Sequence, residues 1–451
     1  MLILICKNNK VRLIYQDANS SAIKAEKSKT NPYKIRIFPM NGIKPVVMQP
    51  IIFALIKERK DPPDRRTVFS PTKLREVQEL FPEAKFLVES SAIRAFPDVA
   101  YKNAEFTVSE DVTAAEVLIG VKEVPIDFLI SGKKYFFFSH TIKKQEYNRE
   151  LLQAVLFKNI ELYDHEVITD QNGNRLIGFG RYAGLVGAYN GIRAWGERHK
   201  SWFLPPASTL SGLKAMKAKL DEINLPNIKI CLTGGGRVAG GAKEILDYLK
   251  IRQVYVDDFL NMEFDEPVYC KIDVLDYNKR IDGEPATQKE FFRDPTTFES
   301  NFMRFAKVTQ FLITGHFYGD GAPQFLTQED ARNPDFKIEV VADISCDLNG
   351  PIASTIRTST LEDPFYGYDP KTQKETNFDA PGAITVMAVD NLPCALPMDA
   401  SEGFGDMFLN HVMPAFFNDD KDGILERARM TKNGQLTDRF KYLQEFVEGK
   451  E

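Results

Sequence analysis

The chain has 451 residues and a formal net charge of −5 at pH 7, so no chain-wide excess of positive charge indicates nucleic acid or an anionic membrane as a partner. Hydrophobic residues make up 43% of it, enough for a large core that needs no disulfide bonds or structural metal for its stability. The five cysteines are odd in number, widely spaced and free of CxxC, which argues against a disulfide framework or structural zinc and fits a reducing cytoplasm. We therefore expect a cytoplasmic protein whose partners are small molecules.

The N-terminal stretch, residues 1–47, is rich in lysine, asparagine and serine and only weakly periodic, and we assign no fold to it from the sequence. Its apolar run MLILI is too short for the hydrophobic region of a signal peptide. No later stretch reaches the eighteen or so apolar residues of a membrane span. One hypothesis is that translation starts at Met48, which the N-terminal mass of the native protein would test.

A regular alternation begins near Pro50. Apolar runs of strand length alternate with helical patterns; the strands are PIIFALIKE, KFLVES, AEVLIGV, KYFFFSH and IELYDHEVI, and the helices TKLREVQELF, DVAYKNAEF and QEYNRELLQAVLFKN. Strand alternating with helix predicts a parallel sheet covered on both faces. We assign residues 48–177 to a substrate-binding and catalytic domain.

Two of these strands end in ionisable residues. AEVLIGV leads into Lys122 and Glu123, and KYFFFSH ends in His140. Because buried parallel strands place their carboxyl ends at one sheet edge, we expect Lys122 and His140 to come together. Burial lowers the pKa of a lysine and histidine titrates near neutrality, so the pair suits proton transfer. The alternative is that Lys122 is only a charged residue at the end of a strand and that His140 is a hydrogen-bonded histidine in the core.

The second half predicts another Rossmann-like domain. The helical stretch YAGLVGAYNGIRAWGERH carries Gly184, Gly187 and Gly191 on related faces, which predicts a close-packed linking helix. We assign residues 178–390 to a dinucleotide-binding domain and residues 391–451 to the completion of the first domain. The predicted fold class is α/β, with two Rossmann-like domains, parallel sheets, a cleft between them and C-terminal helices that return to the first domain.

A glycine turn lies between a strand and a helix in IKICLTGGGRVAGGAKEILDYL. Gly234, Gly236 and Ala239 match GxGxxG/A, and Asp257 follows 21 residues after Gly236 at the expected end of the next strand. Such glycines let backbone amides approach a pyrophosphate, and the acidic residue binds a ribose hydroxyl. A carboxylate at Asp257 favours NAD and disfavours NADP. The alternative is an ordinary tight turn.

Further cofactor contacts are expected in the same turn and at the ends of two later strands, QFLITG and EVVADIS. The residues are Gly235, Arg237, Val238, Thr314, Gly315, His316, Asp343, Ile344 and Ser345. No histidine, cysteine and aspartate cluster has metal-ligand spacing, and we predict no metal.

Several short motifs resemble one family as a set. They are PDRRTVFSP, IGVKEVP, FFFSHTIKKQEYN, LYDHEVI, GNRLIGFGRYAG, the glycine turn, ADIS and VDNLPCALPMDASEGFG. The set, from about Pro50 to Glu426, resembles the lysine-forming saccharopine dehydrogenases and the lysine–ketoglutarate reductase domains, within the alanine dehydrogenase and transhydrogenase superfamily. His140 is followed by Thr-Ile-Lys-Lys-Gln, which is similar to the saccharopine branch, whereas alanine dehydrogenases typically carry an apolar residue and alanine there.

The resemblance implies roles for individual residues. Lys122 and His140 would be the acid/base pair, with Glu123 and Glu166 tuning their pKa values. Substrate contacts would come from Arg66, which is suited to gripping a carboxylate, and from Gln145 and Phe179. Arg175 would lie near the nucleotide. Two residues depart from the family: Asn174 replaces a second arginine, and Thr233 stands at the first glycine of a GxxGxxG turn, which would shift that contact to Gly234.

The activity implied by the resemblance is NAD-dependent, reversible cleavage of saccharopine to L-lysine and 2-oxoglutarate, without a metal. The motifs fit lysine biosynthesis and degradation equally and indicate no oligomeric state. The alternatives are an oxidoreductase similar to alanine dehydrogenase and a non-catalytic dinucleotide-binding regulator. A regulator would have no need for Lys122, His140 and Arg66 together.

Overall fold

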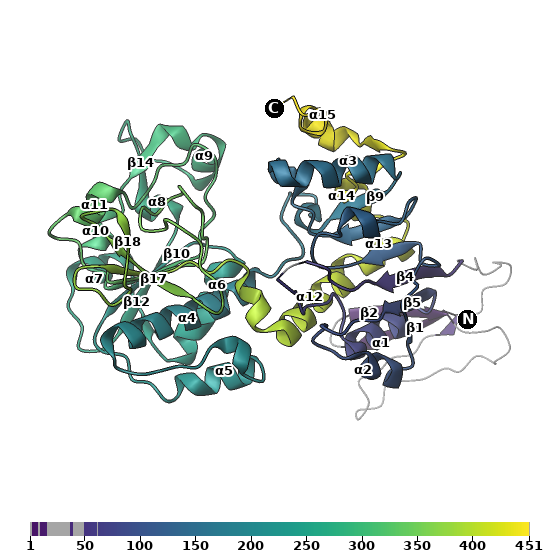
Figure 1. Ribbon diagram of the computed structural model, residues 1–451, viewed down its shortest axis with the longest axis horizontal. Helices are drawn as coiled ribbons and strands as arrows, with labels where there is room; N and C mark the ends of the chain where they lie inside the picture. The colour runs from purple at the N-terminus through teal and green to yellow at the C-terminus, as the bar shows by residue number, and fades with distance from the viewer. Residues whose placement is uncertain (1, 8–9, 16–36, 39–48, 61, 451) are drawn as a thin grey trace. The chain divides into compact units, whose positions relative to one another are not determined.

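The computed structural model describes residues 2–7, 10–15, 37–38, 49–60 and 62–450 (Figure 1). The chain divides into two compact units, Met1–Pro50 and Ile51–Glu451. The first holds a small antiparallel sheet of order β2-β1-β3, formed by β1 (Leu2–Lys7), β2 (Lys10–Tyr15) and β3 (Ile37–Phe38). The hypothesis of a start at Met48 concerns a residue outside the described ranges.

The second unit begins with a six-stranded parallel sheet of order β6-β5-β4-β7-β8-β9. Its strands are β4 (Ile51–Leu55), β5 (Ala84–Glu89), β6 (Thr107–Ser109), β7 (Val117–Ile119), β8 (Lys134–Phe137) and β9 (Glu161–Asp164). Helices α1 (Pro71–Leu80), α2 (Asp98–Asn103) and α3 (Arg149–Phe157) alternate with them. The predicted alternation is therefore confirmed, and β7 lies beside β8 with Ile119 opposite Phe136.

The C-terminal segment packs in the core of this first domain. Its elements are α12 (Pro397–His411), α13 (Met413–Phe417), α14 (Ile424–Ala428), β20 (Thr431–Lys432), β21 (Gln435–Leu436) and α15 (Gln444–Glu448). Phe408 packs edge-on against Phe69 and Phe136, and α15 lies against α3 (Figure 1). The predicted return of the C-terminal helices to the first domain is confirmed.

The second Rossmann-like domain contains an eight-stranded sheet of order β11-β12-β10-β15-β16-β19-β17-β18. The strands are β10 (Lys229–Thr233), β11 (Arg252–Gln253), β12 (Val268–Ile272), β15 (Phe311–Thr314), β16 (Val340–Asp343), β17 (Phe365–Asp369), β18 (Lys374–Thr376) and β19 (Ile384–Met387). β17 pairs antiparallel with β18 and β19, so this sheet is mixed at one edge and parallel elsewhere.

Helices and one hairpin complete this domain. They are α4 (Gly180–His199), α5 (Leu213–Leu220), α6 (Arg237–Tyr248), α7 (Val256–Asn261), α8 (Val274–Tyr277), α9 (Gln288–Arg293), α10 (Met303–Ala306) and α11 (Gln328–Arg332), with β13 (Asn278–Arg280) pairing with β14 (Phe298–Ser300). Within the described ranges, no helix combines the length and apolar character needed to cross a membrane.

Helices α4 and α6 approach each other through glycines, as the sequence predicted for the linking helix. A Cβ atom on Gly184 of α4 would lie 1.9 Å from the carbonyl oxygen of Val238, and one on Gly241 of α6 would lie 2.0 Å from that of Arg181. Only glycine allows this backbone contact. It fixes α6, and with it the glycine turn, against the linking helix.

We expect Gly184→Ala to lower the free energy of unfolding by about 1–3 kcal/mol or more, because the added methyl group overpacks the contact. Urea denaturation measures the change. Gly240→Ala is the matched control, since a Cβ there meets nothing within 4 Å, and it should stabilise the chain by up to about 1 kcal/mol. Equal stability of the two variants would contradict the packing argument.

Candidate active site

A cavity of about 750 Å³ lies between the two Rossmann-like domains, a volume typical of a small-molecule site. It confirms the predicted cleft. Thirteen of the residues predicted from the sequence line it: Arg66, Lys122, His140, Glu166, Arg175, Phe179, Gly234, Gly235, Gly236, Arg237, Val238, Gly315 and His316. The tips of β7 and β8 thus face the glycine turn of the second domain across one cavity.

His140 lies between two carboxylates. Its Nε2 is 3.6 Å from Oε1 of Glu123, and its Nδ1 is 3.4 Å from Oε2 of Glu166. Burial raises the pKa of Glu166, but the hydrogen bond with His140 and the charges of Lys143 and Arg175 outweigh it and lower that pKa to about 2. Glu166 is therefore ionised at neutral pH and can orient the imidazole ring.

Lys122 follows β7 and lines the same cavity. Burial lowers its pKa, and the positive charges of Arg66 and Lys60 lower it further, while Glu123 acts in the opposite direction. A lysine whose pKa is lowered loses its proton nearer to neutral pH and can accept one from a substrate. The two residues predicted to transfer protons therefore line one cavity.

Arg66 is buried and already paired. Its Nε lies 3.0 Å from Oδ1 of Asp64, its Nη2 lies 2.6 Å from Oδ2 of Asp64 and 2.8 Å from Oδ1 of Asn391, and its guanidinium group stacks 4.2 Å from the ring centre of Phe179. These contacts occupy Nε and Nη2. The nitrogen that they leave for a substrate carboxylate is Nη1, because Asp64 occupies the edge of the guanidinium group formed by Nε and Nη2.

The glycine turn has the geometry that a dinucleotide requires. Gly234 has a φ of 103°, in the region that favours glycine, and a Cβ there would lie 2.6 Å from the carbonyl oxygen of Gly315. Gly236 precedes the first turn of α6, and a Cβ there would meet open space, so a ligand can approach this backbone. Thr233, the departure from the family's glycine, hydrogen-bonds His316 through atoms 2.7 Å apart.

The expected position of Asp257 is wrong. Asp257 is exposed on α7 and does not line the cavity, because the second strand, β11, has only two residues at the sheet edge. β12 lies between β10 and β11 in the sheet, and Asp273 follows β12 and lines the cavity. Asp273 Oδ1 accepts a hydrogen bond from Val274 N, and its Oδ2 accepts one from Gln288 Nε2.

Other predicted residues lie outside the cavity lining. Gln145 is exposed, and its Oε1 accepts a hydrogen bond from Tyr147. The carboxylate of Asp343 accepts bonds from the hydroxyl groups of Thr314, Ser345 and Thr355, which hold it inside the protein. Ile344 is in the core against the linking helix, where its side chain faces Gly187. Glu123 is not part of the lining, and its Oε1 lies 3.6 Å from Nε2 of His140.

The sequence reasoning missed part of the lining: Phe138, Gly178, Gly180, Asp273, Val274, Tyr277, Gln288, Phe292, Phe317, Asn391 and Pro393. Asp273 had a signal, since it directly follows the apolar run VYCKI. Gln288 and Phe292 come from α9, whose approach to β12 no local pattern indicates. Among the described residues, no group of three or more histidine, cysteine, aspartate and glutamate side chains could hold a metal ion.

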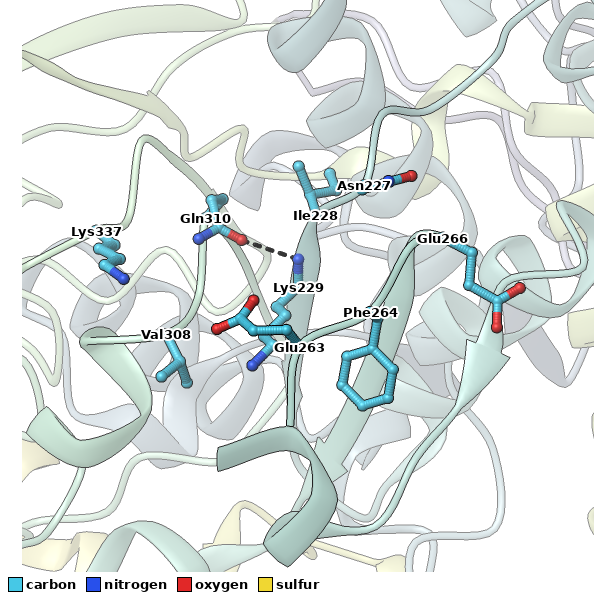
Figure 2. Close-up of a pocket in the computed structure, with 9 residues that line it drawn as sticks. All are labelled: Asn227, Ile228, Lys229, Glu263, Phe264, Glu266, Val308, Gln310 and Lys337. Carbon is cyan, nitrogen blue, oxygen red and sulfur yellow. Dashed lines mark hydrogen bonds between the residues drawn. The ribbon is translucent and has the colours of Figure 1, made fainter. Parts of the chain in front are cut away.

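A second, smaller cavity contains none of the predicted site residues. Figure 2 shows its lining around the start of β10, where Lys229 N donates a hydrogen bond to Gln310 Oε1. Its volume is about 100 Å³, too small for a nucleotide. The Lys229 Nζ atom donates to the carbonyl oxygens of Phe259 and Met262, at the end of α7, which is a structural role.

The chain is similar to several known proteins and to one protein family. The alanine dehydrogenase/PNT N-terminal domain family matches residues 54–186. The mitochondrial alpha-aminoadipic semialdehyde synthase of Mus musculus is 30% identical, over 89% of this chain and 48% of that protein. The saccharopine dehydrogenase [NAD(+), L-lysine-forming] of Yarrowia lipolytica is 25% identical, over 80% of this chain and 91% of that protein. The chain thus spans about half the length of the semialdehyde synthase.

Solved structures agree on the fold. An L-alanine dehydrogenase has a TM-score of 0.60 at 16% identity and covers 89% of this chain and 100% of its own. A transhydrogenase from Sinorhizobium meliloti has a TM-score of 0.52 at 16% identity and covers 86% of this chain and 98% of its own. The comparisons confirm the resemblance seen in the sequence, to saccharopine dehydrogenases and their relatives within the alanine dehydrogenase and transhydrogenase superfamily.

Proposed function

We propose that this chain is an NAD-dependent oxidoreductase that cleaves saccharopine reversibly to L-lysine and 2-oxoglutarate. The observation that carries the proposal is the single cavity in which Lys122, His140 and Arg66 face the glycine turn. The relatives named as saccharopine dehydrogenases support this choice of substrate.

The proposed reaction needs two proton-transfer groups on the chain. Bound NAD would accept a hydride from the glutarate carbon attached to nitrogen. Lys122, with its lowered pKa, would take the proton of the secondary amine. His140, held between Glu123 and Glu166, would guide water onto the resulting imine. Collapse of the carbinolamine breaks the carbon–nitrogen bond and releases lysine and 2-oxoglutarate.

Binding and orientation come from other residues of the lining. Arg66 Nη1 would hold a substrate carboxylate, with the guanidinium group fixed by Asp64, Asn391 and Phe179. Gly234 to Gly236 and the first turn of α6 would hold the pyrophosphate. Asp273 would accept hydrogen bonds from the adenosine ribose.

A steady-state assay with purified chain tests the proposal. NADH consumption in the presence of lysine and 2-oxoglutarate, and NADH formation with saccharopine, are the expected results. The rival amino-acid oxidoreductase predicts NADH formation with alanine instead. A chain that binds NADH and turns over neither substrate would support the non-catalytic regulator.

We expect Asp273→Ser to raise the preference for NADP over NAD by about tenfold or more. The carboxylate repels a 2′-phosphate, a close like-charge pair costs several kcal/mol, and tenfold corresponds to about 1.4 kcal/mol. Serine still offers an oxygen that can cap α8. The ratio of kcat/KM for the two cofactors is the measurement.

Asp257→Ser is the matched control for that variant, because Asp257 is exposed and does not line the cavity. Its cofactor ratio should equal that of the wild type. A shift in the Asp257 variant without a shift in the Asp273 variant would restore the assignment made from the sequence.

A further inference from the structure

We propose that two carboxylates outside the cavity lining, Glu58 and Asp164, are positioning residues that hold the backbones of Lys122 and His140 in their working places. The inference rests on the proposed function in assigning catalysis to Lys122 and His140. It goes further in naming the groups that fix them.

Glu58 holds the segment that carries Lys122. It lies just beyond β4, and its Oε1 and Oε2 accept hydrogen bonds from the backbone N–H groups of Val121 (2.7 Å) and Lys122 (2.8 Å). The ladder between β4 and β7 has ended at this point, with Ile56 N donating to Ile119 O as its last bond. One carboxylate therefore replaces the strand partner for two successive amides, the second of which belongs to Lys122.

Asp164 does the same for His140. It ends β9 and is fully buried. Its Oδ2 accepts hydrogen bonds from Ser139 N (2.9 Å), His140 N (3.1 Å) and Ser139 Oγ (2.5 Å). Its Oδ1 accepts one from Glu166 N (2.7 Å). A single side chain thus ties His140 to Glu166, the carboxylate that orients the imidazole ring.

The backbone of His140 has a conformation that requires stabilising hydrogen bonds. Its φ is 55°, in the left-handed region that costs energy for a residue with a Cβ atom. The hydrogen bonds that the backbone N–H groups of Ser139 and His140 donate to Asp164 stabilise this conformation. The conformation aims the ring at Glu123 and Glu166, because the direction of a side chain follows its backbone.

Glu58 and Asp164 each accept hydrogen bonds through both carboxylate oxygens, which an amide side chain cannot fully replace. In Asp164→Asn or Glu58→Gln one of the two oxygens becomes an NH₂ group, which cannot accept a hydrogen bond from a backbone N–H. The volume is unchanged, so the substitutions test hydrogen bonding and charge and leave the packing intact. Glu89→Gln is the matched control, because buried Glu89 also accepts a backbone bond, from Lys57 N, but touches neither catalytic residue.

The test is a pair of double-mutant cycles on kcat with saccharopine: Asp164→Asn with His140→Gln, and Glu58→Gln with Lys122→Met. A residue that acts through its partner lowers kcat about tenfold or more in the wild-type background and less than about twofold once the partner is gone. Glu89→Gln should change kcat by the same factor in all backgrounds. Equal factors for Asp164→Asn or Glu58→Gln with and without the partner would overturn the proposal.

Crystal structures of the two variants give a readout that needs no turnover. In Asp164→Asn we expect His140 to leave its left-handed conformation and the Nδ1 to Glu166 distance to exceed about 4 Å, beyond hydrogen-bonding range. In Glu58→Gln the segment after β7 should shift. An unchanged His140 and Lys122 in these structures would overturn the proposal. If His140 and Lys122 shift in the variants but the wild-type chain does not turn over saccharopine, the proposed function is contradicted and the positioning roles of Glu58 and Asp164 are not.

Discussion

Lys122→Met is expected to lower turnover of saccharopine by about 100- to 10,000-fold, the usual contribution of a general acid or base. Methionine has nearly the length of lysine but cannot accept a proton. The affinity for NADH, measured by fluorescence titration, should change little, because the glycine turn and α6 lie on the other domain. Lys85→Met, at an exposed position on β5 of the same sheet, is the control and should keep near-normal turnover.

The lowered pKa of Lys122 also leads us to expect that kcat/KM depends on pH. Burial and the charges of Arg66 and Lys60 lower the pKa of Lys122 below its ordinary value of 10.5. The neutral amine is the active base for oxidation, so kcat/KM should rise with pH and level off before the pH at which a free lysine titrates. In Lys122→Met this rise of kcat/KM with pH should be absent. A limb centred at or above 10.5 would contradict the inferred surroundings of Lys122.

His140→Gln is expected to lower turnover by a similar factor, about 100- to 10,000-fold, because glutamine cannot pass a proton between water and substrate. NADH binding should again be retained. His199→Gln is the matched control, since His199 ends α4 and pairs with Glu339, 3.3 Å away in the second domain. Near-wild-type turnover in His140→Gln would remove His140 from the mechanism.

The sequence predicted the parts of the site that depend on local pattern. Lys122 and His140 follow apolar strands that are neighbours in a parallel sheet, so strand order alone brings them to one edge. The glycine turn was equally readable, because its spacing and its place between β10 and α6 are local. The predicted return of the C-terminal helices was also correct.

The misses depend on contacts between segments far apart in the chain. The spacing predicts Asp257 at the end of the next strand, yet β12, further along the chain, lies between that strand and β10. The bonds that Glu58 and Asp164 accept from the backbone N–H groups of Val121, Lys122 and His140 span 24 to 64 residues. No periodicity in a single sequence records such bonds.

A crystal structure of the chain with NADH and saccharopine tests the central claim most directly. We predict that the Nζ atom of Lys122 and the imidazole ring of His140 both lie within about 4 Å of the substrate atoms around the cleaved carbon–nitrogen bond, with the nicotinamide on the facing side. Both ligands bound in this cavity, with either side chain more than about 8 Å from that bond, would contradict the account.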